Sequence, residues 1–142
     1  MREDLINIAH TVLKFSDSKR LEVGQKYSDL IVEGLQEEGK TEEELGKFYL
    51  DLTSLLVCAD GYISGSEFSF FKQVTGLDAD PEEFCYKTGS GDKFEFVSEM
   101  LTRISLLSPK TRSAIVMFGI CFLTSDHDLR DDELELLEKM MD

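Results

Sequence analysis

The stretch FYLDLTSLLVCADGYISGSEFSFF, residues 48–71, joins a long apolar segment to a shorter one through an acidic turn. Large apolar residues recur at helical spacing before the turn, which predicts an amphipathic helix over 42–59. After the turn, Ser64 and Glu67 have the spacing of a capping box, in which each side chain accepts the other residue's backbone N–H. The stretch therefore predicts a helix, a tight turn and a second helix over 65–75.

The same helical period continues through the rest of the chain, and no segment alternates between apolar and polar residues as a strand does. Helix starts are marked by Thr41 and by the pairs Asp80-Pro81 and Ser108-Pro109. We therefore expect an all-α fold, a single-domain helical bundle of about eight helices. The expected helices cover residues 3–16, 20–37, 42–59, 65–75, 81–88, 93–107, 109–125 and 131–141.

Length and composition fit one folded unit. The chain has 142 residues, of which 42% are hydrophobic, enough for one buried core, and we expect a single domain over 1–142. The longest apolar run, AIVMFGICFL at 114–123, is too short to cross a bilayer, so it predicts a buried core helix and no direct membrane insertion. Cys58, Cys85 and Cys121 form no CxxC pair, which favours reduced core thiols in a cytoplasmic protein.

The chain is strongly acidic, with a formal net charge of -14 at pH 7 that arises from 29 acidic and 15 basic residues. A field of this sign repels phosphate backbones and anionic membrane surfaces. Much of the acidity lies near the C-terminal end, in residues 126–142. We therefore expect no nucleic-acid partner, and we expect a cation or a basic protein surface to be bound instead.

An internal repeat links two parts of the chain. Residues 60–68 (DGYISGSEF) align with residues 126–134 (DHDLRDDEL), and the flanking apolar positions match at the same offset. Each copy consists of a long apolar helix, an acid, a turn, an aliphatic residue, a glutamate and a short amphipathic helix. We predict that residues 42–76 and 108–142 form two helical hairpins related by a pseudo-twofold axis.

The first turn also has part of the pattern of a calcium-binding EF-hand loop. The offset from Gly61 to Glu67, with Ile63 at the aliphatic position, is that of the second half of such a loop. The first half is missing, because Leu56 and Cys58 occupy its first and third positions and cannot bind a hard cation. The sequence thus contains half of a metal-binding loop.

Asp60 and Asp126 occupy matching places at the C-terminal end of a long helix, where the helix dipole disfavours an anion by roughly 0.3 to 1 kcal/mol. A solvated surface position or an Asx turn would account for these acids, and so would a bound cation. Glu67 is likewise open to two interpretations, as a helix cap alone or as a metal ligand.

The segments ADGYISGSEFSFF (59–71) and SDHDLRDDELELL (125–137) together resemble the paired ADGxIxxxE signature of the TerB-like family of tellurite resistance. The resemblance covers roughly residues 40–142 and implies an all-helical cytoplasmic bundle. It also implies a link to tellurite, phage and colicin resistance or to general chemical stress, and a divalent-cation site at the acidic signature. The second copy departs from the pattern, since His127 replaces the glycine and Arg130 replaces the polar cap.

Matched residue by residue, the resemblance implies that Asp60 and Glu67 of the first turn and Asp126 and Glu133 of the second turn are metal ligands. The bound ion would be Ca²⁺, Mg²⁺ or Mn²⁺, all of which accept oxygen ligands. No other cofactor is expected.

The two histidines, His10 and His127, lie in no recognisable catalytic motif, so we expect no catalytic residue and no enzymatic activity. We expect a non-enzymatic helical module, resembling TerB-like proteins of tellurite and chemical-stress resistance, that binds a divalent cation at its paired acidic turns. Its partner would be a protein, such as a membrane-associated resistance complex. The alternative is a metal-free acidic adaptor that mediates protein–protein interaction through its charged surface.

Overall fold

A computed structural model describes residues 2–59, 63–80, 84 and 93–141 of the chain. Across these residues the regular structure is entirely helical, which confirms the predicted all-α class. The described helices are α1 (Arg2–Leu13), α2 (Asp17–Glu37), α3 (Glu42–Val57), α4 (Gly65–Thr75), α6 (Lys93–Ser105), α7 (Pro109–Leu123) and α8 (Asp131–Met141). The helix expected over 81–88 lies outside the described residues, apart from the buried Phe84. The count of eight helices and the single domain over 1–142 stay predictions.

The boundary between the first two helices differs from the predicted ranges of 3–16 and 20–37. The Ser16 hydroxyl accepts the Lys19 backbone N–H at 3.2 Å, so Ser16 caps α2 and this helix begins at Asp17. The serine followed by a first-turn acid is a start signal that the sequence prediction missed. Helices α3, α6 and α7 end two residues before the predicted limits, as fraying last turns commonly do, whereas α2, α4 and α8 end at the predicted residues.

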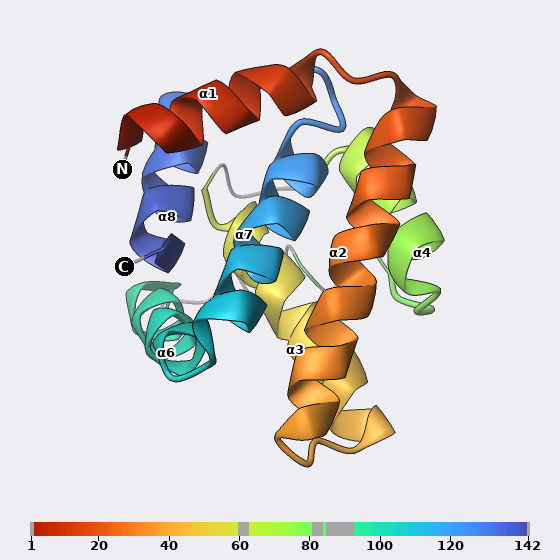
Figure 1. Ribbon diagram of the computed structural model, residues 1–142, viewed down its shortest axis with the longest axis vertical. Helices are drawn as coiled ribbons and strands as arrows, with labels where there is room; N and C mark the ends of the chain where they lie inside the picture. The colour runs from red at the N-terminus through yellow and green to blue at the C-terminus, as the bar shows by residue number, and fades with distance from the viewer. Residues whose placement is uncertain (1, 60–62, 81–83, 85–92, 142) are drawn as a thin grey trace.

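Helix α7 is the central element of the bundle (Figure 1). It packs most extensively against α2, and it also contacts α1, α4 and α8, while α3 packs against α6. Helix α1 lies across one end of the bundle, from the side of α8 to the start of α2. The run at 114–123 is buried except for the half-buried Met117, so the prediction of a core helix is confirmed. None of the described helices combines the length and the apolar content that a bilayer span requires.

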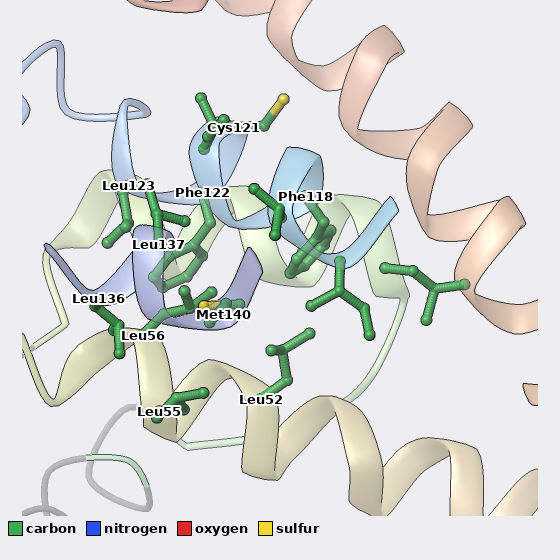
Figure 2. Packing of buried hydrophobic residues seen from close by; sticks show 14 of the residues in the cluster. Leu52, Leu55, Leu56, Phe118, Cys121, Phe122, Leu123, Leu136, Leu137 and Met140 are labelled. Carbon is green, nitrogen blue, oxygen red and sulfur yellow. The ribbon is translucent and has the colours of Figure 1, made fainter. Parts of the chain in front are cut away.

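The buried hydrophobic residues of all these helices form one cluster. Figure 2 shows Leu52 and Leu56 of α3 facing Phe118 and Phe122 of α7, with Leu137 of α8 beside them. Each of these five side chains is fully buried. The repeat places Leu52 opposite Phe118 and Leu56 opposite Phe122 in the sequence alignment, so equivalent positions of the two copies are core residues.

The two predicted hairpins differ in how their second helices pack. Helix α8 packs directly against α7, whereas α4 packs chiefly against α2 and α7. The first connection includes residues 60–62, which lie outside the described part of the chain. The superposition of residues 42–76 on 108–142 therefore stays a prediction.

Helix α2 approaches its neighbours closely at two glycines. A Cβ atom at Gly34 would lie 2.1 Å from Thr111 Oγ1 of α7, and one at Gly24 would lie 2.6 Å from the Phe70 ring of α4. Both distances are shorter than van der Waals contact, so a larger residue at either position would push the helices apart. The two glycines thus allow α2 to approach α4 at Phe70 and the start of α7 at Thr111.

Candidate functional site

Three of the four predicted metal ligands are placed by the structure. Asp60 lies outside the described residues, so the first turn is seen only from Ile63 onwards. Glu67 lies in the first turn of α4, Glu133 lies in the first turn of α8, and Asp126 follows the end of α7. The glutamates are buried, with 2% and 3% of their surface exposed, whereas Asp126 is exposed.

The start of α4 is a complete capping box, as the sequence predicts. The Ser64 N–H donates to Glu67 Oε1 at 2.9 Å, and the Glu67 N–H donates to Ser64 Oγ at 3.1 Å. Two backbone donors that have no partner within the helix are thereby satisfied. Glu67 therefore has a structural role at this helix start, and the predicted capping box is confirmed, while its role as a metal ligand stays a prediction.

The start of α8 has only half of this arrangement. The Arg130 backbone N–H donates to Glu133 Oε1 at 2.9 Å, which is the same contact that Glu67 makes in α4. The reciprocal bond, from the backbone N–H of the glutamate to a hydroxyl oxygen, is missing, because arginine has no hydroxyl. The Glu133 N–H donates instead to Asp132 Oδ1 at 3.0 Å. The glutamate thus keeps its capping contact although the residue that it caps has changed.

The turn after α7 is shaped by Asp126 and His127. Asp126 Oδ1 accepts the Asp128 N–H at 3.1 Å, which is an Asx turn, one of the interpretations open for this acid. His127 has a φ of 63°, in the left-handed region that favours glycine. In the repeat alignment this position corresponds to Gly61 of the first turn. At His127 the second turn therefore has a backbone conformation suited to glycine, although the side chain departs from the signature.

His127 connects this turn to the start of α2. Its Nε2 atom lies 3.1 Å from Asp17 Oδ1, and the same carboxylate oxygen lies 3.2 Å from Arg20 Nη1. The partner of His127 is therefore Asp17 of α2, not one of the acids beside it in the chain.

Arg20 is the main polar residue that sequence reasoning missed. It is 1% exposed, and each of its side-chain nitrogens donates a hydrogen bond. Its acceptors are Thr124 Oγ1, Asp17 Oδ1 and the carbonyls of Val12, Leu13 and Phe15, at 3.0 to 3.3 Å. The guanidinium thus lies where α1 and α7 end, and a cation is favourable at a helix C-terminus. The helical spacing could have identified Arg20 as a buried residue, since it shares the buried face of α2 with Gly24, Ser28, Ile31 and Leu35.

Cys121 of α7 is a buried thiol, as expected for a core residue. Burial raises the pKa of the Cys121 thiol to about 12, although the positive charge of Arg20 acts in the opposite direction. The thiol therefore stays protonated at neutral pH, which makes it a poor nucleophile. Cys58 is also buried, and Cys85 lies outside the described residues.

A polar cleft of about 290 Å³ lies beside these groups, between the starts of α2 and α4. Its lining includes Arg20, Ser66, Ser69 and Gln73. The Arg20 nitrogens are bonded as described above, and Gln73 Nε2 donates to Ser69 Oγ at 2.8 Å. The lining also includes Leu21 and Phe70, and among its polar side chains Arg20 bonds to Asp17 and Gln73 bonds to Ser69.

The described residues of the two turns form no cluster of three or more His, Cys, Asp or Glu side chains suited to a metal ion. Glu133 accepts a backbone N–H, and Asp126 closes an Asx turn. Both carboxylates thus have a structural use that requires no cation. The chemistry that the structure displays at the second turn is helix capping and chain reversal.

Comparison of the chain with protein-family models, curated proteins and solved structures found no match. The similarity to the TerB-like family therefore depends on the signature residues of the two turns.

Proposed function

We propose that this chain is a non-enzymatic helical adaptor that binds a basic protein partner through the acidic surface beside the turn between α7 and α8. This acidic surface consists of Asp126, Asp128, Asp131 and Asp132. The observation that supports the proposal is a division of roles within the turn. The glutamate of the signature, Glu133, is buried and caps α8, whereas these four aspartates are exposed.

Exposed acids on a chain of net charge -14 attract a basic surface over distance and orient it on approach. The contact between His127 and Asp17 of α2 connects the turn that carries these aspartates to the bundle. On the strength of the resemblance, we place the adaptor in a cytoplasmic system of tellurite or chemical-stress resistance. Its partner there would be a protein of a membrane-associated resistance complex.

The experiment compares wild type with a variant in which all four aspartates of the acidic surface are changed to asparagine. Asparagine keeps the side-chain oxygens that Asp126 and Asp132 use as acceptors, so the turn should persist. The matched control changes the exposed Glu33, Glu37, Glu38 and Glu43 to glutamine, which alters the net charge equally. Partners captured from cells that express each form are compared at low and at high salt.

If the chain is such an adaptor, wild type and the control should retain the partner at low salt and release it at high salt. The aspartate variant should not retain the partner. Equal retention by both variants would show that the acidic surface is not the binding surface. Loss from both variants would show that overall charge alone determines capture.

A second candidate function is divalent-cation binding at the paired turns. It is favoured by the burial of Glu67 and Glu133, which are equivalent in the repeat and are only 2% and 3% exposed. A nearby cation would favour the charged form of such carboxylates. Asp60 and Asp126 would complete the ligand set in this proposal, with Ca²⁺, Mg²⁺ or Mn²⁺ as the ion.

Thermal unfolding of wild type, Asp60→Asn and Asp126→Asn tests this candidate, with chelator and with several concentrations of each cation at constant ionic strength. A cation at one hundred times its dissociation constant should raise the free energy of unfolding by about 2.7 kcal/mol. Each variant should lose this increase while keeping the stability of the metal-free protein. Stabilisation of wild type no larger than that by a monovalent salt would exclude the cation site and leave the adaptor.

A further inference from the structure

A groove of about 320 Å³ lies between α1, α7 and α8, on the part of the bundle where these three helices meet (Figure 1). Most of its lining is apolar, and the apolar residues are Leu5, Ile8, Pro109, Val116, Met117, Ile120 and Met141. The polar lining consists of Asp4, Arg112 and Ser113. The groove lies apart from the acidic turns, and neither proposed function uses it.

The apolar lining of the groove includes both buried side chains and more exposed, flexible ones. Val116 and Ile120 are buried, while Ile8 leaves 42% of its surface exposed, an unusual amount for a large aliphatic side chain of this protein. Met117 and Met141 are half-buried. Methionine side chains are flexible and polarisable, so they adjust to the shape of an apolar ligand.

Arg112 provides a positive charge within this apolar lining. Its Nε atom is buried and has no hydrogen-bond partner, and no ion pair joins its guanidinium to any described carboxylate, including that of Asp4. A buried N–H without an acceptor is unfavourable, and its presence calls for an explanation such as an absent ligand. Arg112 also lies in the first turns of α7, where the helix dipole adds to the attraction of an anion.

We propose that this groove binds an amphipathic carboxylate, with an aliphatic chain against Ile8, Met117 and Met141 and the carboxylate on Arg112. The planar guanidinium matches a carboxylate and binds it with two parallel hydrogen bonds. The carboxylate contacts the terminal nitrogens, and rotation of the long side chain brings Nε to it as well. A volume of about 320 Å³ is near the lower end for ligand sites, which suits a medium-length chain.

Negative charge on the protein opposes the binding of a carboxylate ligand in two ways, and this makes the proposal specific. The net charge of -14 repels any anion at long range, and Asp4 lines the same groove. Binding must therefore depend on contact with the aliphatic chain and on Arg112 together. Affinity should rise with chain length, and a short carboxylate should bind too weakly to saturate.

The test is a titration of the isotope-labelled full chain with decanoate below its micelle concentration, followed by nuclear magnetic resonance. Hexanoate, decanol and decylamine are the comparison ligands. Saturable shifts are expected at the amides of Ile8, Met117 and Ile120, with decanoate binding more tightly than the other three. Equal binding of decanol and decanoate would overturn the role of the carboxylate, and shifts that do not saturate would overturn the site.

Arg112→Gln should weaken decanoate binding about tenfold or more, the loss expected for one charged hydrogen-bonded contact. Lys110→Gln is the matched control, because it removes the same charge from an exposed position of the same helix outside the groove. It should leave the affinity unchanged. If Lys110→Gln weakens decanoate binding as much as Arg112→Gln does, the proposal is wrong. Asp4→Asn should strengthen binding, because it removes the opposing carboxylate.

A second variant keeps the test independent of any folding defect in Arg112→Gln. Ile8→Glu places a charge on the exposed apolar wall, where the fold tolerates it, and should abolish the saturable shifts. A second copy of this chain is the competing occupant. If dilution of the protein alone reproduces the groove shifts and sedimentation shows a dimer, a second copy covers the groove and the carboxylate proposal is wrong.

Discussion

Helices α4 and α8 occupy matching places in the repeat, yet they begin with different capping chemistry. At α4, Ser64 and Glu67 exchange both hydrogen bonds of a capping box. At α8, Glu133 accepts the Arg130 N–H in the same way, but no hydroxyl is present to accept the Glu133 N–H. The shared element is therefore the buried glutamate, and the residue before the helix varies. The comparison shows that the glutamate of the second turn caps a helix start even where the hydroxyl of a capping box is absent.

The two turns also differ in what holds them to the bundle. The second turn follows Thr124, whose hydroxyl accepts from Arg20 Nε at 3.2 Å, and its His127 pairs with Asp17. These contacts connect the end of α7 to the start of α2, more than one hundred positions away in the chain. In the described part of the first turn, Ser64 and Glu67 bond to each other at the start of α4. The second turn is thus held to α2 by long-range contacts, whereas the described hydrogen bonds between Ser64 and Glu67 are local.

The largest expected effect comes from removing this long-range connection. Arg20→Met should lower the free energy of unfolding by about 3 kcal/mol or more, because three backbone carbonyls and the Thr124 hydroxyl, buried or partly buried, each lose a charged donor. Lys19→Met is the control, since Lys19 is exposed and carries the same charge. Chemical denaturation measures both variants.

Hydrogen exchange on Arg20→Met would sharpen the comparison further. The amide of His127, which donates to the Thr124 carbonyl, should exchange faster, while that of Glu67 should not. Equal acceleration at both turns would mean that they are coupled and not separately anchored.

A smaller effect is expected from the two glutamates. Glu67→Ala and Glu133→Ala should each cost about 2 kcal/mol, because each leaves a backbone N–H at a helix start without its acceptor. Glutamine at either position retains an oxygen acceptor and should cost less. A loss at one site that is several times the loss at the other, measured by denaturation in chelator, would contradict the equivalence of the two glutamates.

The left-handed backbone at His127 predicts a third difference. His127→Gly should be more stable than His127→Ala by about 1 kcal/mol, because a Cβ is strained at a φ of 63°. Both variants lose the contact with Asp17, so that loss cancels in the comparison. Paired thermal unfolding curves measure the difference, and equal stability would show that the turn relaxes out of the left-handed region.

The smallest effect concerns the missing half of the capping box. Arg130→Ser should be more stable than Arg130→Ala by about 0.5 to 1 kcal/mol, since serine supplies the hydroxyl that α8 lacks. Ser64→Ala should lose a similar amount from α4. Using alanine as the reference at residue 130 removes whatever the arginine side chain contributes. A negligible difference would show that Asp132 already replaces the hydroxyl fully.

Local chemistry was predictable from the sequence because its partners lie within one helical turn. The capping boxes of Thr41 with Glu44 and of Ser64 with Glu67 follow from a spacing of three residues. The N–H of Thr41 and its hydroxyl lower the pKa of the Glu44 carboxyl, as accepted hydrogen bonds to a carboxylate do. The helical period likewise predicted the buried run in α7, since every turn of that helix faces other helices.

Only the tertiary structure could decide which charged residues are buried and what they contact. Arg20 meets Thr124 across 104 positions, and Arg112 lies beside Ile8 and Met141 in a groove made by three helices. No local pattern encodes such neighbours, because the positions and rotations of whole helices set them through packing. The same applies to His127, whose partner Asp17 lies on another helix. The sequence by itself determined that the chain is helical and where most helices start, whereas packing determined which polar groups are anchored and which remain available for binding.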